Sequence, residues 1–410
     1  MRLRRIDALE LKMLYLVEAG VIVTQVLGFE SLTSLLFLMT FPLTVLLWLS
    51  TIHKSLTEND VIMLITAVLA TAGVLLNAFV TNATLSFSSI KKLIMFIMTL
   101  LFLQTAYRIR IRKEEESFIN RVADFLILFL VGMYILRPAQ MHTIQGIPTR
   151  YLTFRFSNPN LTAMFLTCLY ILKTQRLFVR TTWYRKLYHI ATSVLLAWFI
   201  LETQARNCLL VAVMYTAAIF WLMFRGWGGM RIGRLWAALV AWLPALFVAA
   251  YVSLIYQPWV QKLLSFLVSE GKGLDSRMIM WEPALQALKR YPLTGAYFVI
   301  SNGTGSAQMH NSHLDIATSY GIITLVLVCL LLMRYLHQKG RRYREKRQFA
   351  HILAFACAIM MGLGEAAVFS GGMGIYILAG AFLVMSNDRV ADKNGSSERH
   401  RSNEMLFLRR

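Results

Sequence analysis

The stretch DVIMLITAVLATAGVLLNAFV runs from Asp60 to Val80 and carries no charged residue after its first position. An α-helix of about 20 apolar residues is long enough to cross the ~30 Å hydrocarbon core of a bilayer. Apolar blocks of the same kind recur along most of the chain, and they are continuous rather than alternating, which excludes a transmembrane β-barrel. The sequence therefore predicts an all-α polytopic membrane protein.

The composition agrees with this class. The 410 residues are 57% hydrophobic and only 15% charged, whereas a soluble domain carries roughly 25% charged residues. We expect about twelve transmembrane helices and one large extracytoplasmic loop. The twelve predicted spans are 13–28, 32–50, 60–80, 90–106, 119–136, 159–173, 187–203, 207–224, 235–255, 319–336, 349–367 and 372–386.

The distribution of basic residues predicts the sidedness of the protein. A net charge of +21 would suggest nucleic-acid binding in a soluble protein. Here 30 Lys and Arg residues fall in the segments that we place inside, 11 fall in those that we place outside, and Arg121 lies at the start of a span. By the positive-inside rule, this asymmetry puts both termini in the cytoplasm. We therefore expect an integral membrane protein with no nucleic-acid partner.

The same layout divides the chain into four regions. Residues 1–255 hold the first nine spans, 256–318 form the largest extracytoplasmic loop, 319–386 hold the last three spans, and 387–410 form a basic tail. The tail is polar and is predicted to be disordered. The outer loop is the only long segment that is neither apolar nor a basic cytoplasmic loop. We expect it to work on a polar substrate at the outer face of a membrane.

Arg206 is a candidate for binding an anion at that face. It lies in the tight turn QARN, from Gln204 to Asn207, where a helix is predicted to begin. An anion bound there would also meet free backbone N–H groups and the positive end of the helix dipole. The simpler interpretation is that Arg206 reaches the lipid headgroups or pairs with Glu202.

Arg277 is the second candidate, in the stretch GLDSRMIMW. Asp275 or Ser276 can cap a short helix there, and Arg277 and Trp281 then share one helix face. Pro283 must kink this helix or start a second one, running to about residue 290. A guanidinium presents a fork of donors that matches phosphate oxygens. The simpler interpretation is a solvated arginine on an interfacial helix.

The segment HNSHLD, from His310 to Asp315, directly precedes the predicted span 319–336. A neutral imidazole at His310 could take a proton from a sugar hydroxyl. Asn311 and Ser312 supply neutral hydrogen bonds suited to a carbohydrate, and Asp315 could orient either His310 or His313. The simpler interpretation is a pair of solvated loop histidines. A metal site is conceivable here, but the other outer loops offer no obvious ligand apart from His142, so we expect no metal and no cofactor.

Taken in order, these segments resemble the O-antigen ligase and O-antigen polymerase (Wzy-type) superfamily of bacterial cell-surface polysaccharide enzymes. The resemblance covers residues 150–335 in detail and depends on the order of five short motifs. They are SNPN (Ser157 to Asn160), QARN (Gln204 to Asn207), DSRMIMW (Asp275 to Trp281), YPLTG (Tyr291 to Gly295) and HNSHLDIATSYGI (His310 to Ile322). QARN lacks the small residues that usually flank the arginine in the family, and Pro283 interrupts the helix after Trp281.

The resemblance implies a GT-C-like architecture and a metal-independent, inverting glycosyl transfer at the outer face of the bacterial plasma (inner) membrane. The donor would be a glycan on undecaprenyl diphosphate. Arg206 and Arg277 would stabilise the diphosphate leaving group, and His310 would be the general base on the acceptor hydroxyl. Further substrate-binding candidates are Arg155, Asn158, Asn160, Trp281, Asn311, His313 and Asp315. Membrane lipids, a chain-length regulator and a flippase are the other expected partners.

Several functions compete for these features. In a repeat-unit polymerase the acceptor is another lipid-linked glycan, whereas in a ligase it is lipid A core or another surface anchor; we favour the polymerase because that group is the more numerous and varied. A transporter or flippase would place charged residues near the midplane and often shows repeated halves. Here the intramembrane acids are few (Glu18, Glu365), and no repeat is visible. A passive scaffold would leave the Arg and His residues without a role.

Overall fold

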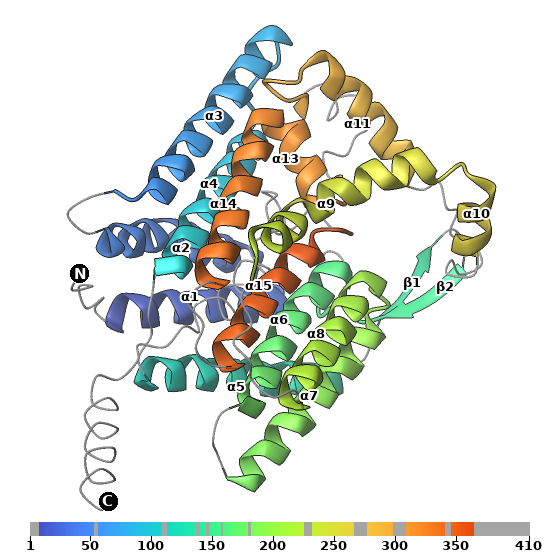
Figure 1. The fold of residues 1–410 in the computed structure, drawn as a ribbon. Helices are drawn as coiled ribbons and strands as arrows, with labels where there is room; N and C mark the ends of the chain where they lie inside the picture. Colours follow the sequence, from blue (N-terminus) through green and yellow to red (C-terminus); the bar gives the residue numbers. More distant parts are fainter. Residues whose placement is uncertain are drawn as a thin grey trace, which may run out of the picture.

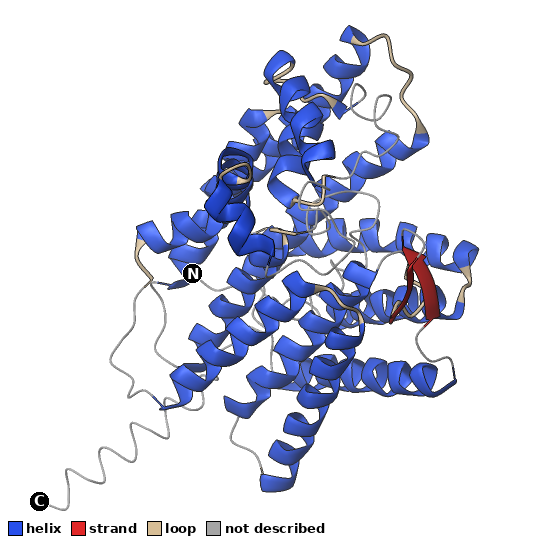
Figure 2. Ribbon diagram, turned by 90° about the vertical axis from the view of Figure 1, so that its right-hand side faces the viewer, coloured by secondary structure: helices blue, strands red, loops and turns tan. Residues whose placement is uncertain are grey.

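A computed structural model of the chain describes residues 8–52, 56–108, 113–136, 140–144, 147–156, 159–178, 182–224, 232–265, 277–297, 309–340 and 346–364. The described part is a bundle of helices with one short β-hairpin (Figures 1 and 2). Ten of the twelve predicted spans each overlap one helix, and an eleventh, 319–336, falls on two. The twelfth, 372–386, lies outside the described residues.

The helices α1 to α9 are Ala8–Leu27, Glu30–Thr51, Glu58–Val80, Phe87–Arg108, Lys113–Leu136, Pro159–Gln175, Trp183–Glu202, Arg206–Phe224 and Arg234–Leu254. They are followed by α10 (Pro258–Ser265), α11 (Met278–Arg290), α13 (Ser312–Tyr320), α14 (Ile322–Gly340) and α15 (Lys346–Met361). A single turn of 3-10 helix, Arg176–Phe178, extends α6.

The hairpin is a departure from the predicted all-α fold. Strands β1 (Gln140–Ile144) and β2 (Ile147–Tyr151) pair antiparallel, with Ile144 opposite Ile147. Figure 2 shows the hairpin at one edge of the helical bundle. Its sequence contains the β-branched residues that favour strands, joined by the two-residue stretch Gln145-Gly146, a spacing typical of hairpins. The hairpin lies between the predicted spans 119–136 and 159–173.

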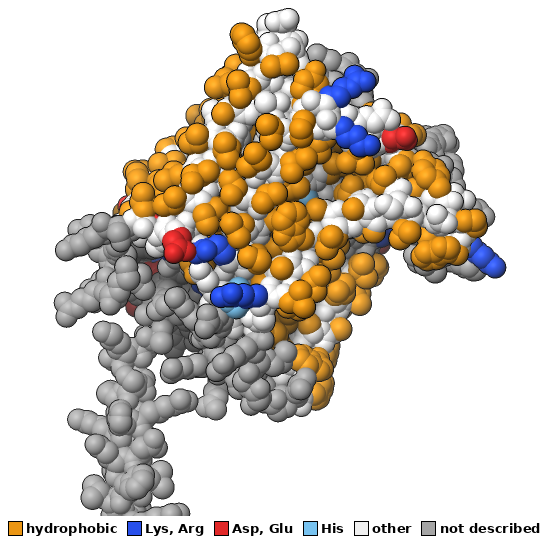
Figure 3. All heavy atoms as spheres, turned by 45° about the horizontal axis from the view of Figure 1, so that its top comes forward, with side chains coloured by type: hydrophobic (Ala, Val, Ile, Leu, Met, Phe, Trp, Pro, Cys, Tyr) orange, Lys and Arg blue, Asp and Glu red, His pale blue; other side chains and the backbone are white. Residues whose placement is uncertain are grey.

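Seven helices of the described part are long and apolar enough to cross a membrane. They are α2, α3, residues 89–108 of α4, residues 114–136 of α5, α8, α9 and α14. Their outer faces carry large apolar side chains, such as Phe79 (79% exposed), Leu128 (67%) and Val68 (66%). Figure 3 shows one face on which hydrophobic side chains dominate and few charged ones lie. Because water-soluble proteins rarely expose such continuous apolar surface, the chain is a polytopic helical membrane protein. The count of twelve spans and the sidedness stay predictions.

Two helices are enclosed by the others. Every residue of α6 from Leu161 to Gln175 is buried, and so is every residue of α13. Helix α13 packs against α3, α9, α11 and α14, and Figure 1 shows it at the same end of the molecule as α11. It is rich in polar side chains, which must find partners inside the protein when neither water nor lipid headgroups can supply them. These partners build the candidate site described below.

The predicted span 319–336 is divided by a helix break. Helix α13 ends at Tyr320, and α14 begins at Ile322. Gly321 between them has φ +91°, a conformation that L side chains rarely adopt, and a Cβ on it would overlap the carbonyl oxygen of Leu293. The backbone N–H of Ile322 donates to the Pro292 carbonyl at 2.8 Å. The motif YPLTG is therefore wedged against the break, and HNSHLD begins a buried helix instead of a solvated loop.

Gly295 completes this wedge. Its φ is +76°, and a Cβ there would lie 2.8 Å from the backbone of α13 at the Thr318 carbonyl oxygen. The Gly295 carbonyl accepts a hydrogen bond from Asn77 Nδ2 at 2.7 Å, and the N–H of Ala296 donates to the Thr318 carbonyl at 2.6 Å. The close approach of the two backbones requires a residue without a side chain.

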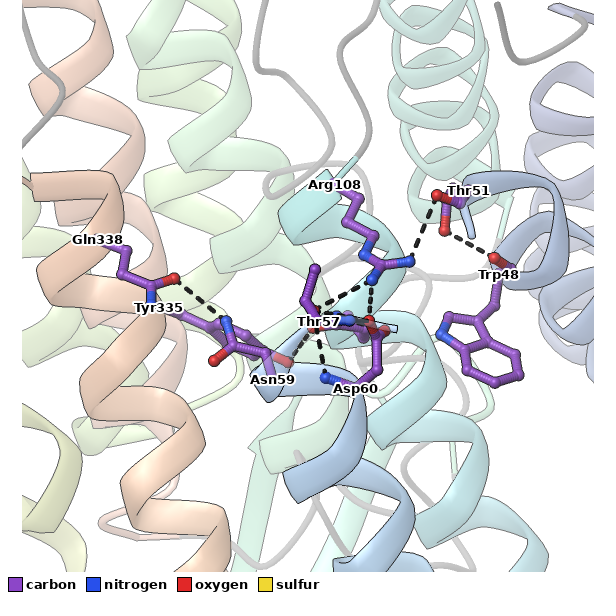
Figure 4. Close-up of polar contacts among 9 residues, drawn as sticks. Trp48, Thr51, Thr57, Asn59, Asp60, Arg108, Tyr335 and Gln338 are labelled. Atoms are coloured by element: carbon purple, nitrogen blue, oxygen red, sulfur yellow. Dashed lines mark hydrogen bonds and ion pairs between the residues drawn. The ribbon is translucent and has the colours of Figure 1, made fainter. Parts of the chain in front are cut away.

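A polar cluster holds α3, α4 and α14 together at the other end of these helices (Figure 4). Asp60 forms an ion pair with Arg108 and accepts a hydrogen bond from Gln104 Nε2 at 2.7 Å. The Tyr335 hydroxyl donates to Gln104 Oε1 at 2.6 Å. Thr57 and Asp60 also form a capping box at the start of α3. The three helices are thus tied at one end, while their other ends surround or adjoin α13.

Candidate functional site

Helix α11 brings Arg277 against the segment that carries His310. Arg277 Nη1 donates to the main-chain oxygen of His310 at 3.1 Å, and its guanidinium carbon lies 5.8 Å from the centre of the Trp281 ring. Trp281 is fully buried, and its Nε1–H donates to the Met309 carbonyl at 2.6 Å. The prediction that Arg277 and Trp281 share a face is confirmed. Two adjacent side chains of one helix thus hold two adjacent carbonyls of the HNSHLD segment.

The details of α11 differ from the prediction. Arg277 itself is the N-cap residue and makes no side-chain capping bond. The predicted caps, Asp275 and Ser276, lie outside the described residues. Pro283 lies inside one continuous helix that ends at Arg290. Pro283 is the sixth residue of this helix and lies beyond its first turn, so the helix continues without the hydrogen bond that an N–H at this position would donate to the Ile279 carbonyl.

His310 lies at a tight turn directly before α13. Its φ is +49°, in the left-handed region, and its side chain is half-buried. The next residue, Asn311, caps the helix: its Oδ1 accepts from the N–H groups of His313 and Leu314, both at 3.0 Å. Asn311 Nδ2 donates to the Pro244 carbonyl at 3.0 Å and to the Leu363 carbonyl at 3.2 Å. Asn311 is fully buried and therefore anchors the turn that presents His310.

Non-glycine residues with a left-handed backbone conformation (positive φ) concentrate in or next to the predicted motifs. In the described part there are five, and only Asn82 lies elsewhere. Phe154 and Arg155 lie three and two residues before SNPN, Gln204 opens QARN, and His310 opens HNSHLD. Such residues cost of order 1–3 kcal/mol each and concentrate at functional sites, where the surrounding structure holds them. Backbone strain therefore marks the same three segments that the sequence motifs marked.

His313 and Asp315 are buried in the interior of the bundle. His313 Nε2 makes a hydrogen bond of 2.7 Å with the Ala241 carbonyl on α9. Burial lowers the pKa of His313 to about 4, so its ring is neutral near pH 7 and Nε2 carries the proton that it donates. In this arrangement His313 fastens α13 to α9, and its fully buried side chain offers no surface to a substrate.

Asp315 pairs with a residue that the sequence analysis did not single out. Its Oδ1 lies 3.1 Å from Lys92 Nζ, and both side chains are buried. Burial raises the pKa of Asp315, and Lys92 opposes that rise. The sequence did contain a signal, because a lysine at the third residue of the predicted span 90–106 is a functional candidate by default. The partner, 223 positions away, is what the sequence alone did not reveal.

Arg206 begins α8, as predicted, and is exposed. The following residue, Asn207, donates from Nδ2 to the Met361 carbonyl at 2.8 Å. The next carbonyl along, that of Gly362, accepts from the backbone N–H of Ser312 at 2.9 Å. Helix α15 ends at Met361, earlier than the predicted span 349–367, so residues 361–364 bridge QARN and HNSHLD. The structure thus brings the start of α8 to the same locality as the start of α13.

The segment that carries Arg155, directly before α6, is not part of this locality. Arg155 is exposed, and its Nη1 donates to the Leu27 carbonyl at the end of α1 at 2.6 Å. Gln25 Nε2 donates to the Arg155 carbonyl at 3.1 Å. These contacts fasten the segment to α1 and do not bring Arg155 to His310. Asn160 is half-buried in the first turn of α6, and Asn158 lies outside the described residues.

Accessibility separates the candidates into two sets. Arg206 is exposed, and Arg277 and His310 are half-buried. The residues that support them, Trp281, Asn311, His313 and Asp315, are fully buried. Two guanidinium groups and one imidazole are therefore presented by a rigid, internally hydrogen-bonded frame. Within the described ranges no three His, Cys, Asp or Glu side chains come together as a metal site would require.

No protein-family model matches the chain, and no curated protein is significantly similar to it. The resemblance to the O-antigen ligase and polymerase superfamily therefore depends on the motifs alone.

Proposed function

We propose that the chain is a glycosyltransferase that polymerises oligosaccharide repeat units carried on undecaprenyl diphosphate, at the outer face of the bacterial plasma membrane. One contact carries this proposal: Arg277, a cation suited to a phosphate, is bonded to the backbone of His310, the candidate proton acceptor, at 3.1 Å. Arg206 begins a helix that is joined to the same turn through residues 361–364. A leaving-group site and a base are thus neighbours.

The proposed reaction is a single displacement at the anomeric carbon of the donor glycan. The acceptor hydroxyl oxygen forms the new glycosidic bond while the bond to the diphosphate oxygen breaks, and that electron pair leaves with the lipid diphosphate. Arg206 and Arg277 stabilise the charge that develops there, as preorganised cations do in other transferases. His310 receives the proton of the hydroxyl. Attack from the side opposite the leaving group inverts the anomeric centre.

The geometry of the frame suits such a step. The Arg277 hydrogen bond uses the main-chain oxygen of His310, so this bond does not engage the imidazole nitrogens. The frame itself is buried and internally paired: Asn311 and His313 bond to backbone carbonyls, and Asp315 bonds to Lys92. Because the supporting groups are fixed before substrate arrives, little reorganisation is needed as charge develops.

The decisive experiment supplies the full-length protein, purified into lipid nanodiscs, with synthetic lipid-diphosphate repeat units. A ladder of products that grows by one repeat unit, and that is insensitive to a chelator, is the expected result. A matched protein with His310→Asn serves as the inactive control. If only added lipid A core receives a single glycan, the protein is a ligase instead. If neither acceptor is used, the proposed function is wrong.

Membrane sidedness gives an independent test. The proposal requires α11 and the HNSHLD turn to face the cell exterior. A reporter fused near residue 290, in the exposed last turn of α11, is expected to read as extracytoplasmic. A cytoplasmic reading would contradict both the predicted topology and the donor that we propose.

A further inference from the structure

Lys92 occupies a position that is costly for a lysine. It lies on α4 inside a helix that is long and apolar enough to span a membrane, and the residue is only 8% exposed. Its ammonium lies 3.1 Å from Asp315 Oδ1 and 5.0 Å from the centre of the Tyr297 ring. The Lys92 main-chain oxygen accepts from the Tyr320 hydroxyl at 3.2 Å. Helix α4 is therefore attached to both ends of α13 around this one residue.

Few other charges act on Asp315. Among the described residues, the other titratable side chain that acts on its pKa is His310, which lowers it. Tyr297 and Tyr320 are the remaining titratable neighbours. Three of the other helices packed on α13, namely α3, α9 and α14, carry their charged residues at their far ends. In α11, the charged residues are Arg277 at the first turn and those on its exposed outer face. These far-end residues are Glu58 and Asp60 on α3, Arg234 on α9, and Arg334, His337 and Lys339 on α14.

One oxygen of Asp315 has no ordinary hydrogen bond. Within the described residues, Oδ2 is buried without a partner of ordinary geometry, and Oδ1 is held by Lys92. A hydrogen bond from the Met309 backbone also lowers the pKa of Asp315. A buried carboxylate without a cation would take up a proton and become neutral. A buried pair whose only role is structural can often be replaced by apolar residues at no cost in stability. The half-satisfied carboxylate beside His310 suggests that its charge has a use.

We propose that Lys92 is a positioning residue of the candidate site, because its ammonium keeps the Asp315 carboxylate ionised. Asp315 lies one helical turn after Asn311, the residue that follows His310. This inference rests on the proposed function, in which His310 accepts the proton of the acceptor hydroxyl. The imidazolium formed in that step gains a fixed counter-charge. Because Lys92 and Asp315 sum to zero charge, this pair adds no net charge to the site.

The first test is spectroscopic and needs no substrate. Infrared spectra of the full-length protein at neutral pH are compared with those of Asp315→Asn, which identifies any carbonyl stretch of a protonated Asp315. We expect no such band in the unmodified protein, a band in Lys92→Met, and none in Lys92→Arg. Lys91→Met is the matched control, since Lys91 is the adjacent residue and lies over the Phe37 ring instead. A band in the unmodified protein, or its absence in Lys92→Met, would overturn the inference.

The second test uses the glycan-transfer assay. We expect Lys92→Met to lower the rate about 10²-fold near neutral pH, as loss of support to a general base does, and the loss to shrink as pH rises through the raised pKa of Asp315. Lys92→Arg recovers most of the lost rate, and Lys91→Met behaves as the unmodified protein. A rate loss in Lys92→Met that is equal at every pH, and that Arg does not repair, contradicts the positioning role.

The two tests separate the inference from the function on which it rests. If the unmodified protein transfers no glycan but the infrared band appears only in Lys92→Met, the proposed function is wrong and Lys92 still sets the charge of Asp315. If glycan is transferred but the band does not respond to Lys92, the proposed function stands and the inference is wrong. Thermal unfolding of each variant confirms that the comparison is made between folded proteins.

Discussion

The side chain of Arg277 is bonded to the main chain of His310, with 3.1 Å between Nη1 and the carbonyl oxygen. The two residues lie 33 positions apart. Arg277 is the N-cap residue of α11, and His310 lies in the turn before α13. The bond joins a candidate anion-binding group to the strained turn that presents a candidate base. A change at Arg277 therefore acts on the charge of the site and on the position of His310 together.

Arg277 is expected to be poorly replaced by lysine. An ammonium keeps the charge, but it lacks the planar fork that can bond the His310 carbonyl and a phosphate at the same time. We expect Arg277→Ala to lower the transfer rate about 10²–10³-fold and Arg277→Lys to recover only a small part, measured as product formed per minute. Arg290→Lys, an exposed change at the other end of α11, should leave the rate unchanged. Equal rates for Arg277→Lys and the unmodified protein would show that the fork has no role.

His310→Asn tests the base with the least disturbance of the backbone. Asparagine tolerates the left-handed φ of +49° better than most residues, and its amide cannot accept a proton near neutral pH. We expect the transfer rate to fall about 10²–10⁴-fold, with an unchanged thermal unfolding midpoint. His310→Ala should lose the same activity and also some stability, because alanine is less suited to that backbone conformation. Full activity in His310→Asn would exclude His310 as the base.

The helical scaffold could be predicted from local sequence. Asp60 to Val80 predicted a helix, and α3 spans Glu58–Val80. The start of α8 at Arg206 was also predicted, and so was the helix face shared by Arg277 and Trp281. Both follow from helix termini and i, i+4 spacing, which are local properties. What failed was the environment of HNSHLD. Its polar composition is typical of a loop, but its partners lie on distant helices, so no local pattern could indicate burial.

The helix break has a similar explanation. SYGIITLVLV, residues 319–328, reads as the start of one continuous span. At the break, the carbonyls of Pro292 and Leu293 lie where a Cβ on residue 321 would be, and the Pro292 carbonyl accepts from the N–H of Ile322. The β-hairpin and the bridge at residues 361–364 likewise depend on contacts between segments far apart in sequence. Local sequence predicted the elements, and long-range packing decided which ones form the site.

Alanine at Gly295 or Gly321 is expected to destabilise the protein. Both residues have positive φ, and both approach another backbone too closely for a Cβ. We expect each substitution to lower the free energy of unfolding by roughly 1–3 kcal/mol, seen as a lower midpoint of thermal unfolding in detergent. Gly132→Ala is the control, because nothing lies within 4 Å of a Cβ there and the residue is inside α5. It should be neutral or stabilising by up to about 1 kcal/mol. If all three behave alike, the YPLTG wedge does not constrain the helix break.

Arg108 is expected to stabilise the fold from the end opposite the candidate site (Figure 4). Asp60 is fully buried, and Arg108 is the cation that pairs with it, so Arg108→Met would leave an uncompensated buried carboxylate. Removing one partner of such a pair costs about 3–5 kcal/mol, which thermal unfolding in detergent would measure. Glu58→Gln is the matched control in the same cluster: the Glu58 side chain is 80% exposed, and its ion pair with Arg334 should contribute about 0–1 kcal/mol. Adding Asp60→Asn to Arg108→Met should restore part of the lost stability, since the buried charge is then gone. If the double variant is no more stable than Arg108→Met, the loss comes from packing and not from the charge of Asp60.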